Sequence, residues 1–196
     1  MLRSTVLKVI PLVAAGALFS FSTQAAWHID NAKSQVNFVS VKKDHVAEAH
    51  HFESISGALF ENGTFSVDID LTSVNTGIDI RDVRMKKHLF NTEQYPSANL
   101  KAVVSKRLIA QLPVGETIKT KVQAKLSLLT QVQDVEVAVS VTKVSADTIL
   151  VTSLKPLLIK AQDYKLVAGI DKLRELAGLS RIGYTVPVSF VLRLTK

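Results

Sequence analysis

The stretch 117–144, TIKTKVQAKLSLLTQVQDVEVAVSVTKV, decides the fold. Its first half has apolar residues on alternate positions, separated by Lys, Gln and Ser: Ile118, Val122, Ala124, Leu126 and Leu128. After Thr130 and Gln131 the alternation resumes with Val135, Val137, Val139 and Val141. A period of two over this length predicts two long strands, each with one face in the core and the other in water. The short Thr130-Gln131 step predicts that they form an antiparallel hairpin.

The same period recurs along the rest of the chain. It predicts strands at 27–29, 35–41, 65–71, 98–105, 148–152, 157–159 and 186–194, and less regular strand structure within 45–60. The Asn62-Gly63 pair favours positive φ and predicts a hairpin turn before the strand that starts at Phe65. Gly57 indicates a bulge or a bend in its strand.

Two segments depart from this period and predict short helices. Asp79 is placed to cap a helix that begins at Ile80 and stops before Tyr95 and Pro96. Asp171 is placed to cap a second helix over 171–177, with Gly178 as its stop. No linker, repeat or low-complexity run divides the sequence after residue 25, so one domain is expected.

Long, half-buried strands with few edge-protecting features must close on one another. The sequence therefore predicts an all-β fold, either a sandwich or a barrel, and favours the barrel. About eight strands are expected, which gives a single eight-stranded antiparallel barrel with two short helices. The interior of such a barrel is filled by side chains or holds one slim ligand.

The first 25 residues have the pattern of a secretory signal peptide. Arg3 and Lys8 lead into an almost wholly apolar run over 9–21, and small residues follow up to Ala25 and Ala26, with cleavage expected after Ala25. The apolar run is short for a membrane span, so an uncleaved anchor is the weaker alternative. We expect residues 26–196 to form an exported, periplasmic domain of net charge +7 − 2 = +5.

The composition argues against several kinds of site. The sequence has no cysteine, which removes thiol catalysis, thiolate metal ligands and disulfides together. His50 and His51 are adjacent and would face opposite sides of a strand, and no HxH or HExxH spacing is present, so no metal is expected. No G-x-S-x-G motif indicates hydrolysis, and the basic excess is too diffuse to indicate nucleic acid. We expect neither catalysis nor a cofactor.

A set of residues spread over the chain resembles the YceI-like family of exported, lipocalin-like proteins. The residues that carry it are Asp30, Ser34, Val36, Phe38, Phe52, Gly57, Ser73-Val74-Asn75-Thr76, Arg81-Asp82, Leu89-Phe90 and Tyr95-Pro96. The resemblance implies an elongated, lipocalin-like β-barrel. Its interior would hold an amphiphile with a long tail, such as a polyprenyl phosphate, an isoprenoid quinone or a fatty acyl chain.

Eight apolar residues are predicted to line the barrel interior and to contact such a tail: Phe38, Phe65, Val122, Leu126, Val137, Val139, Val188 and Phe190. The alternative is a core that side chains fill, with no space for a ligand. The residues alone support the two about equally, and the resemblance favours the tunnel. A buried tail would be stabilised by about 0.8 kcal/mol per CH₂ relative to water.

Arg81, Arg84 and Lys87 lie in a basic cluster on the first predicted helix. They are candidates to bind a phosphate headgroup or an anionic membrane surface. The alternatives are a solvated helix face, or an Arg81-Asp82 pair that ties the helix to the barrel. We expect a non-catalytic periplasmic protein that holds an isoprenoid or other long-chain lipid. The alternative is an exported stress-response or interaction protein with a packed barrel.

Overall fold

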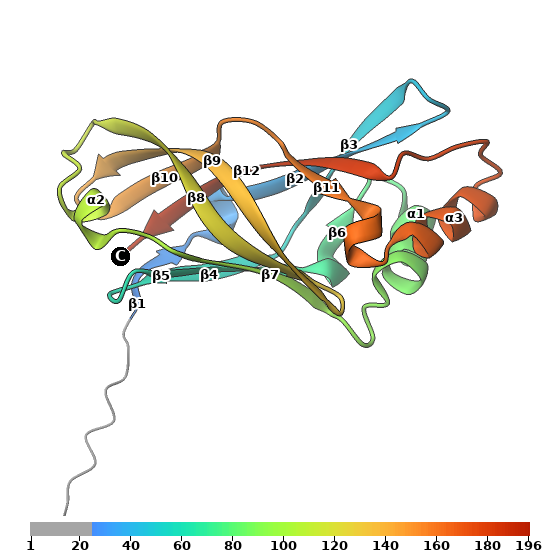
Figure 1. Cartoon of the computed structure of the whole chain (residues 1–196), viewed down its shortest axis with the longest axis horizontal. Helices are drawn as coiled ribbons and strands as arrows, with labels where there is room; N and C mark the ends of the chain where they lie inside the picture. Colours follow the sequence, from blue (N-terminus) through green and yellow to red (C-terminus); the bar gives the residue numbers. More distant parts are fainter. Residues whose placement is uncertain (1–24) are drawn as a thin grey trace, which may run out of the picture.

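Eight strands close the barrel wall. In the computed structural model, which describes residues 25–196, antiparallel pairing runs in the order β1-β4-β5-β7-β8-β9-β10-β12. The ring returns to β1 where His28 pairs with Thr195 of β12. The wall forms an elongated barrel (Figure 1) built from β1 (Ala25–Ile29), β4 (Ile55–Phe60), β5 (Thr64–Asp70), β7 (Ser97–Val103), β8 (Thr117–Leu128), β9 (Gln131–Ser145), β10 (Thr148–Ser153) and β12 (Thr185–Thr195). The predicted eight-stranded antiparallel barrel is confirmed.

Further strands extend one side of this wall. The first half of β12 runs past β10 and pairs with β11 (Leu157–Lys160) on one side and β2 (Gln35–Lys42) on the other. β2 then pairs with β3 (Val46–Phe52), and β3 with the short β6 (Val74–Asn75). The predicted irregular region 45–60 thus holds two strands, β3 and β4. The tip of the β2–β3 hairpin projects from the barrel (Figure 1).

The central hairpin has the predicted form. β8 and β9 pair without interruption from Thr117 opposite Thr142 to Leu128 opposite Gln131. Leu129, with φ of +52°, and Thr130 make the turn, which therefore lies one residue before the predicted step. On β8 the inner residues 124, 126 and 128 are buried, whereas the lysines between and before them are exposed, as the alternation requires.

The first predicted helix is present, but its cap is not the predicted one. α1 (Asp79–Arg84) continues directly into a π-helical segment, η3 (Met85–Phe90). Ile78 occupies the N-cap position without a side-chain hydrogen bond, so the prediction that Asp79 caps the helix is wrong. Asp82, rather than Asp79, binds the preceding segment of the chain: its carboxylate accepts hydrogen bonds from the backbone NH and the hydroxyl of Thr76.

The second predicted helix begins earlier than expected. α3 spans Val167–Leu176, so Asp171 lies inside it rather than at its cap, and its carboxylate accepts a hydrogen bond from the Tyr184 hydroxyl. The predicted stop at Gly178 is confirmed, because this residue has φ of +63°. Gly169 allows α3 to cross η3 closely: a Cβ there would lie 2.7 Å from the carbonyl oxygen of His88.

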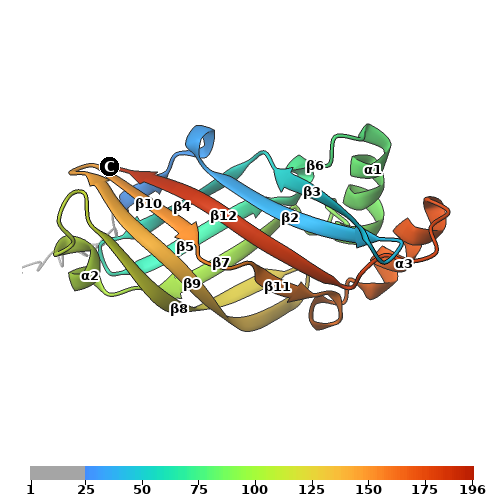
Figure 2. The ribbon, with the colours of Figure 1, turned by 90° about the horizontal axis from the view of Figure 1, so that it is seen from above.

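One α-helix and three 3₁₀ turns complete the described chain. The sequence did not predict α2 (Lys106–Ala110), which precedes β8 at the end of the barrel away from α1 and α3 (Figure 2). The 3₁₀ turns are η1 (Asn31–Lys33), η2 (Leu71–Ser73) and η4 (Ala161–Tyr164). Within residues 25–196 no helix is long and apolar enough to cross a membrane. The predicted signal peptide lies almost wholly outside the described residues.

Candidate functional site

An apolar cavity of about 550 Å³ runs inside the barrel. Its wall comes from the inner faces of the strands, where β8 contributes Leu126 and Leu128 and β9 contributes Val137 and Val139. η3 and α3 line one end of the cavity, and residues around α2 line the other. Because inward side chains alternate with outward ones, the period of two in the sequence places only apolar groups on most of this wall.

All eight residues that the sequence predicted for the barrel interior lie on the cavity wall: Phe38, Phe65, Val122, Leu126, Val137, Val139, Val188 and Phe190. They come from β2, β5, β8, β9 and β12, so they surround the cavity. Their contact with a lipid tail stays a prediction.

The helices contribute wall residues that the sequence analysis did not single out. Met85, Leu89 and Phe90 reach the cavity from η3, and Leu166 and Ile170 reach it from the start of α3. The spacing of Met85 and Leu89 on one face of a helix was the available signal for the first group. Leu166 and Ile170 were missed because α3 begins before its predicted start.

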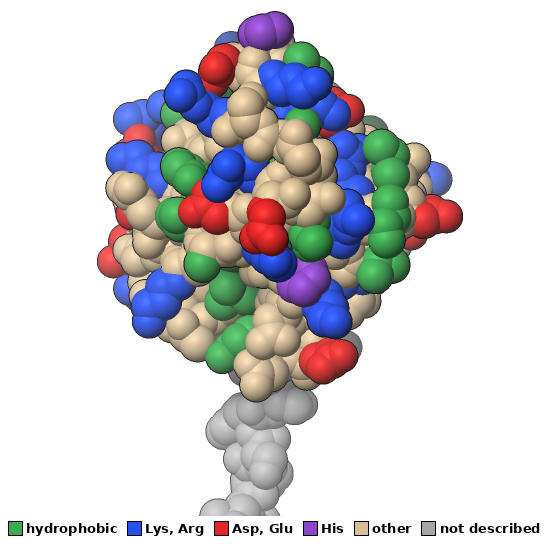
Figure 3. Space-filling view, turned by 90° about the vertical axis from the view of Figure 1, so that its right-hand side faces the viewer, with side chains coloured by type: hydrophobic (Ala, Val, Ile, Leu, Met, Phe, Trp, Pro, Cys, Tyr) green, Lys and Arg blue, Asp and Glu red, His purple; other side chains and the backbone are tan. Residues whose placement is uncertain are grey.

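The helix-capped end of the barrel is tightly packed. Met85, Phe90 and Ile170 are each about 5–6% exposed and belong to one apolar cluster with Tyr164 and Leu166. Figure 3 views the molecule from this end and shows a continuous surface on which basic and acidic side chains are interspersed. The outer surface here therefore offers mixed charge rather than one basic patch.

The three predicted headgroup residues lie at this end, and none lines the cavity. Arg81 donates to the carboxylate of Glu48 at 2.8 Å and to the carbonyl oxygen of Thr76 at 2.7 Å. Arg84 donates to the carbonyl oxygen of Leu176 at the end of α3, at 3.1 Å. Lys87 is exposed. Two of the three cations thus join α1 to other elements, and their headgroup role stays a prediction.

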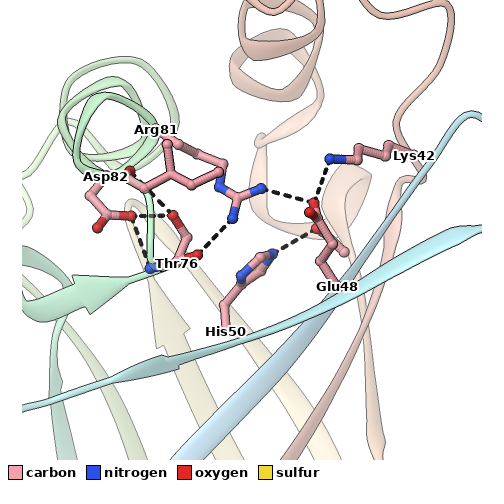
Figure 4. Close-up of polar contacts among 8 residues, drawn as sticks. Lys42, Glu48, His50, Thr76, Arg81 and Asp82 are labelled. Atoms are coloured by element: carbon pink, nitrogen blue, oxygen red, sulfur yellow. Dashed lines mark hydrogen bonds and ion pairs between the residues drawn. The ribbon is translucent and has the colours of Figure 1, made fainter.

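Arg81 is the centre of a polar cluster between α1 and the β2–β3 hairpin (Figure 4). Glu48 on β3 accepts from both Arg81 and Lys42, each at 2.8 Å. His50 lies two residues after Glu48 on the same face of β3. It is only 4% exposed, and its Nε2 lies 2.9 Å from the Ser40 hydroxyl. His50 also stacks obliquely near Phe38, with ring centroids 5.1 Å apart. The inner face of this hairpin therefore changes from apolar to charged towards its tip.

The pKa values of His50 and Glu48 are both lowered, which favours a neutral histidine and an ionised carboxylate. Burial, followed by the nearby Arg81 charge, lowers the pKa of the His50 imidazole below its ordinary value. The hydrogen bond from Lys42, together with the charge of Arg81, lowers the pKa of the Glu48 carboxyl. At neutral pH the cluster is therefore a neutral histidine beside a carboxylate that two cations hold. His50 Nδ1 and Arg81 Nε have no hydrogen-bond partner among the described residues.

No group of His, Asp or Glu side chains in the described part of the chain is arranged to hold a metal ion. His50 is buried and the neighbouring His51 is half-buried, in line with their places on alternate faces of β3. The cluster around Arg81 is thus built of ion pairs and hydrogen bonds between protein groups.

The model of the protein family described as the YceI-like domain matches residues 27–194 of this sequence. This chain belongs to the YceI-like family. The match spans the barrel from β1 to β12, including the Arg81-Asp82 motif on which the resemblance rested. In this YceI-like protein the motif joins α1 to β3 and to the segment around Thr76.

Solved structures support the same assignment. A polyisoprenoid binding domain from Saccharophagus degradans, implicated in plant cell wall breakdown, is 44% identical, with a TM-score of 0.86 over 88% of this chain and 99% of that one. BcnA of Burkholderia cenocepacia is 23% identical, with a TM-score of 0.66 over 84% and 98%. The Campylobacter jejuni YceI protein is 15% identical, with a TM-score of 0.57 over 97% and 99%. The last two show the shared fold alone. Among curated proteins, no match was found.

Proposed function

We propose that this YceI-like chain is a non-catalytic periplasmic binding protein that holds one long-chain amphiphile with its tail inside the barrel. The observation that carries the proposal is the apolar cavity of about 550 Å³. A tail that enters it leaves water, which is favourable by about 0.8 kcal/mol per CH₂. The relative from Saccharophagus degradans is a polyisoprenoid binding domain at 44% identity, which supports an isoprenoid as one ligand class.

The volume of the cavity limits the length of the tail. An apolar cavity of about 150 Å³ binds one benzene, so a cavity of about 550 Å³ has room for roughly 20 carbon atoms. A C16–C20 acyl chain or a four-unit isoprenoid fills this space. A longer polyprenyl tail would have to extend out of the barrel or widen it. We therefore expect affinity to rise with chain length up to about 20 carbons and then to level off.

One feature supports a binding role rather than catalysis, and a second supports export of the protein from the cytoplasm. The titratable cluster of Lys42, Glu48, His50 and Arg81 contributes no side chain to the cavity wall, and the titratable residue among the described residues of that wall, Lys121, is ion-paired with Glu136. The predicted signal peptide ends at Ala25, where β1 begins. A packed barrel with no ligand is the alternative function class, and a cavity of this size weighs against it.

The headgroup has two possible positions, one at each end of the cavity. Of the three predicted headgroup residues at the helix-capped end, Lys87 is exposed, whereas Arg81 and Arg84 are bound to other protein groups. At the other end the cavity approaches α2 and the first residues of β8. Peripheral contact with an anionic membrane would be favoured by the same exposed cations.

A loading experiment tests the proposal. The protein is purified without its first 25 residues, stripped of lipid with organic solvent, refolded, and incubated with saturated fatty acids, a prenyl phosphate and a quinone. Native mass spectrometry then counts bound molecules per chain. We expect one molecule per chain and an affinity that rises with tail length. A protein that regains its fold but takes up none of these lipids would contradict the proposal.

A further inference from the structure

The barrel wall has an incomplete seam between β7 and β8. Hydrogen-bonded pairing between the two strands ends at Ala102 opposite Ala124. β8 continues for seven more residues towards its start at Thr117, paired with β9 only. β7 ends at Val103, and the chain turns into α2. The side of β8 that faces α2 is therefore an open strand edge, and α2 lies beside it (Figure 1).

The internal cavity reaches this open edge. In a closed wall only every second residue of a strand lines the interior. Here the consecutive residues 120–123 of β8 line the cavity, as do the consecutive residues 103–105 at the end of β7. Val103 lines the cavity although it is 79% exposed. The inner residues Ile118 and Val122 are only half-buried, whereas Ala124 further along is buried. These features mark an opening through the wall.

A second hollow lies outside the same edge. It is formed by α2, the turn that follows it and the start of β8, and it includes Arg107, Leu112 and Lys119. Thr120 lines both this outer hollow and the internal cavity. Ile109 of α2 lines the cavity from beside the opening. The cavity and the surface hollow beside α2 therefore meet at Thr120.

Two basic residues, Arg107 and Lys119, line the outer hollow. The stretch 98–130 has one acid, Glu116, and six basic residues: Lys101, Lys106, Arg107, Lys119, Lys121 and Lys125. Lys121 and Lys125 form ion pairs with acids on β9. Arg107 and Lys119, which line the hollow, make no ion pair with any described residue. Both can therefore receive an anionic group.

We propose that the β7–β8 seam is the port of the binding protein and that the hollow beside α2 seats the ligand's anionic headgroup. The lipid tail passes the open edge of β8 into the cavity, and Arg107 and Lys119 contact a carboxylate or phosphate that remains outside. This inference rests on the proposed lipid-binding function and assigns its headgroup position. It places the headgroup at the end of the barrel away from Arg81, Arg84 and Lys87.

The first test closes the port. Continuing the register from Ala102–Ala124, Val103 is the next residue opposite Gln123, and both line the cavity. In V103C/Q123C a short thiol cross-linker that contains a disulfide would join the two sides of the seam. The chain has no native cysteine, so the reaction is confined to this pair. The matched control is S140C/T152C, a register pair inside the closed β9–β10 ladder.

Uptake of oleic acid and of oleyl alcohol by the cross-linked proteins is followed by stopped-flow fluorescence and native mass spectrometry. We expect cross-linked V103C/Q123C to take up both lipids at least tenfold more slowly, reduction to restore the rate, and cross-linked S140C/T152C to match the unmodified protein. Equal rates for both cross-linked proteins would overturn the port. If the unmodified protein binds neither lipid, the proposed function and the port both fail.

The second test addresses the headgroup seat. The variant R107Q/K119Q should bind oleic acid roughly 2- to 30-fold more weakly, the range for two exposed ion pairs, and bind neutral oleyl alcohol as the native protein does. Lys33→Gln removes an exposed cation from η1, which lines neither the cavity nor the outer hollow, and controls for the loss of one positive charge. If Lys87→Gln weakens oleic acid binding and R107Q/K119Q does not, the headgroup lies at the helix-capped end and the seat is refuted.

Discussion

Filling the cavity from the wall should shorten the tail that the protein accepts. Ala124 lies on the inner face of β8 and is 5% exposed. Its register partner on the neighbouring strand β7 is Ala102. Both residues line the cavity. Two facing alanines leave space on the cavity side, so Ala124→Phe would direct an aromatic ring into the cavity rather than into packed side chains. Phenylalanine also suits a strand, and filling a cavity commonly stabilises a protein.

The expected size of the effect follows from the volumes. A benzene-sized ring takes about 150 Å³, roughly a quarter of the cavity, and so displaces about six of some 20 carbon atoms. At about 0.8 kcal/mol per CH₂, a tail that fills the native cavity would lose about 5 kcal/mol. This corresponds to a fall in affinity of roughly three orders of magnitude. A tail of about 14 carbons should bind almost as tightly as before.

The assay is a titration of saturated fatty acids from C10 to C20 by native mass spectrometry and calorimetry. The control is Ala138→Phe, the same substitution on the outer face of β9, which should leave the chain-length profile unchanged. We expect the optimum of Ala124→Phe to shift by about six carbons while its melting temperature is held or raised. If the folded variant binds C18 and C20 acids as tightly as the native protein, the tail does not occupy this cavity.

Three further predictions concern stability. Gly169→Ala should lower the free energy of unfolding, measured by urea titration, by about 1–3 kcal/mol, because its Cβ would lie 2.7 Å from the His88 carbonyl oxygen. The control is Gly183→Ala, whose Cβ would have its nearest contact at 3.6 Å and which should have little effect in the same titration. Because burial lowers the pKa of His50 below its unfolded value of 6.5, the unfolded chain binds more protons, and stability should fall as the pH drops through 6.5. Urea titrations at pH 7 and pH 5 should show a smaller fall in His50→Gln, and an equal fall would refute the assignment to this residue. Arg81→Gln should cost about 1–3 kcal/mol in urea unfolding, because it leaves the Thr76 carbonyl without its partner and removes one of the two cations that hold Glu48. Unchanged stability with weaker oleic acid binding would instead support a headgroup contact.

Most of the barrel strands could be predicted from the sequence because their inward and outward side chains alternate. In the β8–β9 hairpin the buried residues follow one another at every second position, and this spacing can be read from the local sequence. Closure of the ring also followed, because half-buried strands without protected edges must pair. The predicted caps at Asp79 and Asp171 were wrong for a different reason. α3 begins at Val167, so Asp171 lies inside the helix, where its carboxylate accepts a hydrogen bond from Tyr184, and α1 has Ile78 rather than Asp79 at its N-cap position.

The candidate site was predicted only where it depends on strand periodicity. The wall residues of β8, β9 and β12 follow from the period of two, whereas the partner of Arg81 does not. Glu48 is 33 residues away from Arg81 in the chain, and only the packing of α1 on β3 brings them together. The seam between β7 and β8 was also beyond the sequence pattern. β8 alternates regularly through Val122, although β7 no longer accompanies it there.

Native mass spectrometry of the protein purified from its native source, combined with lipid extraction, would show directly whether the barrel carries a lipid. We expect one long-chain amphiphile per polypeptide, with about 20 of its carbons protected inside the barrel. The mass of the bound species and its extracted tail would also identify the ligand class. A lipid-free mass for protein isolated under conditions that preserve lipid complexes, together with failure to load fatty acids, prenyl phosphates or quinones, would show that the barrel does not hold a lipid.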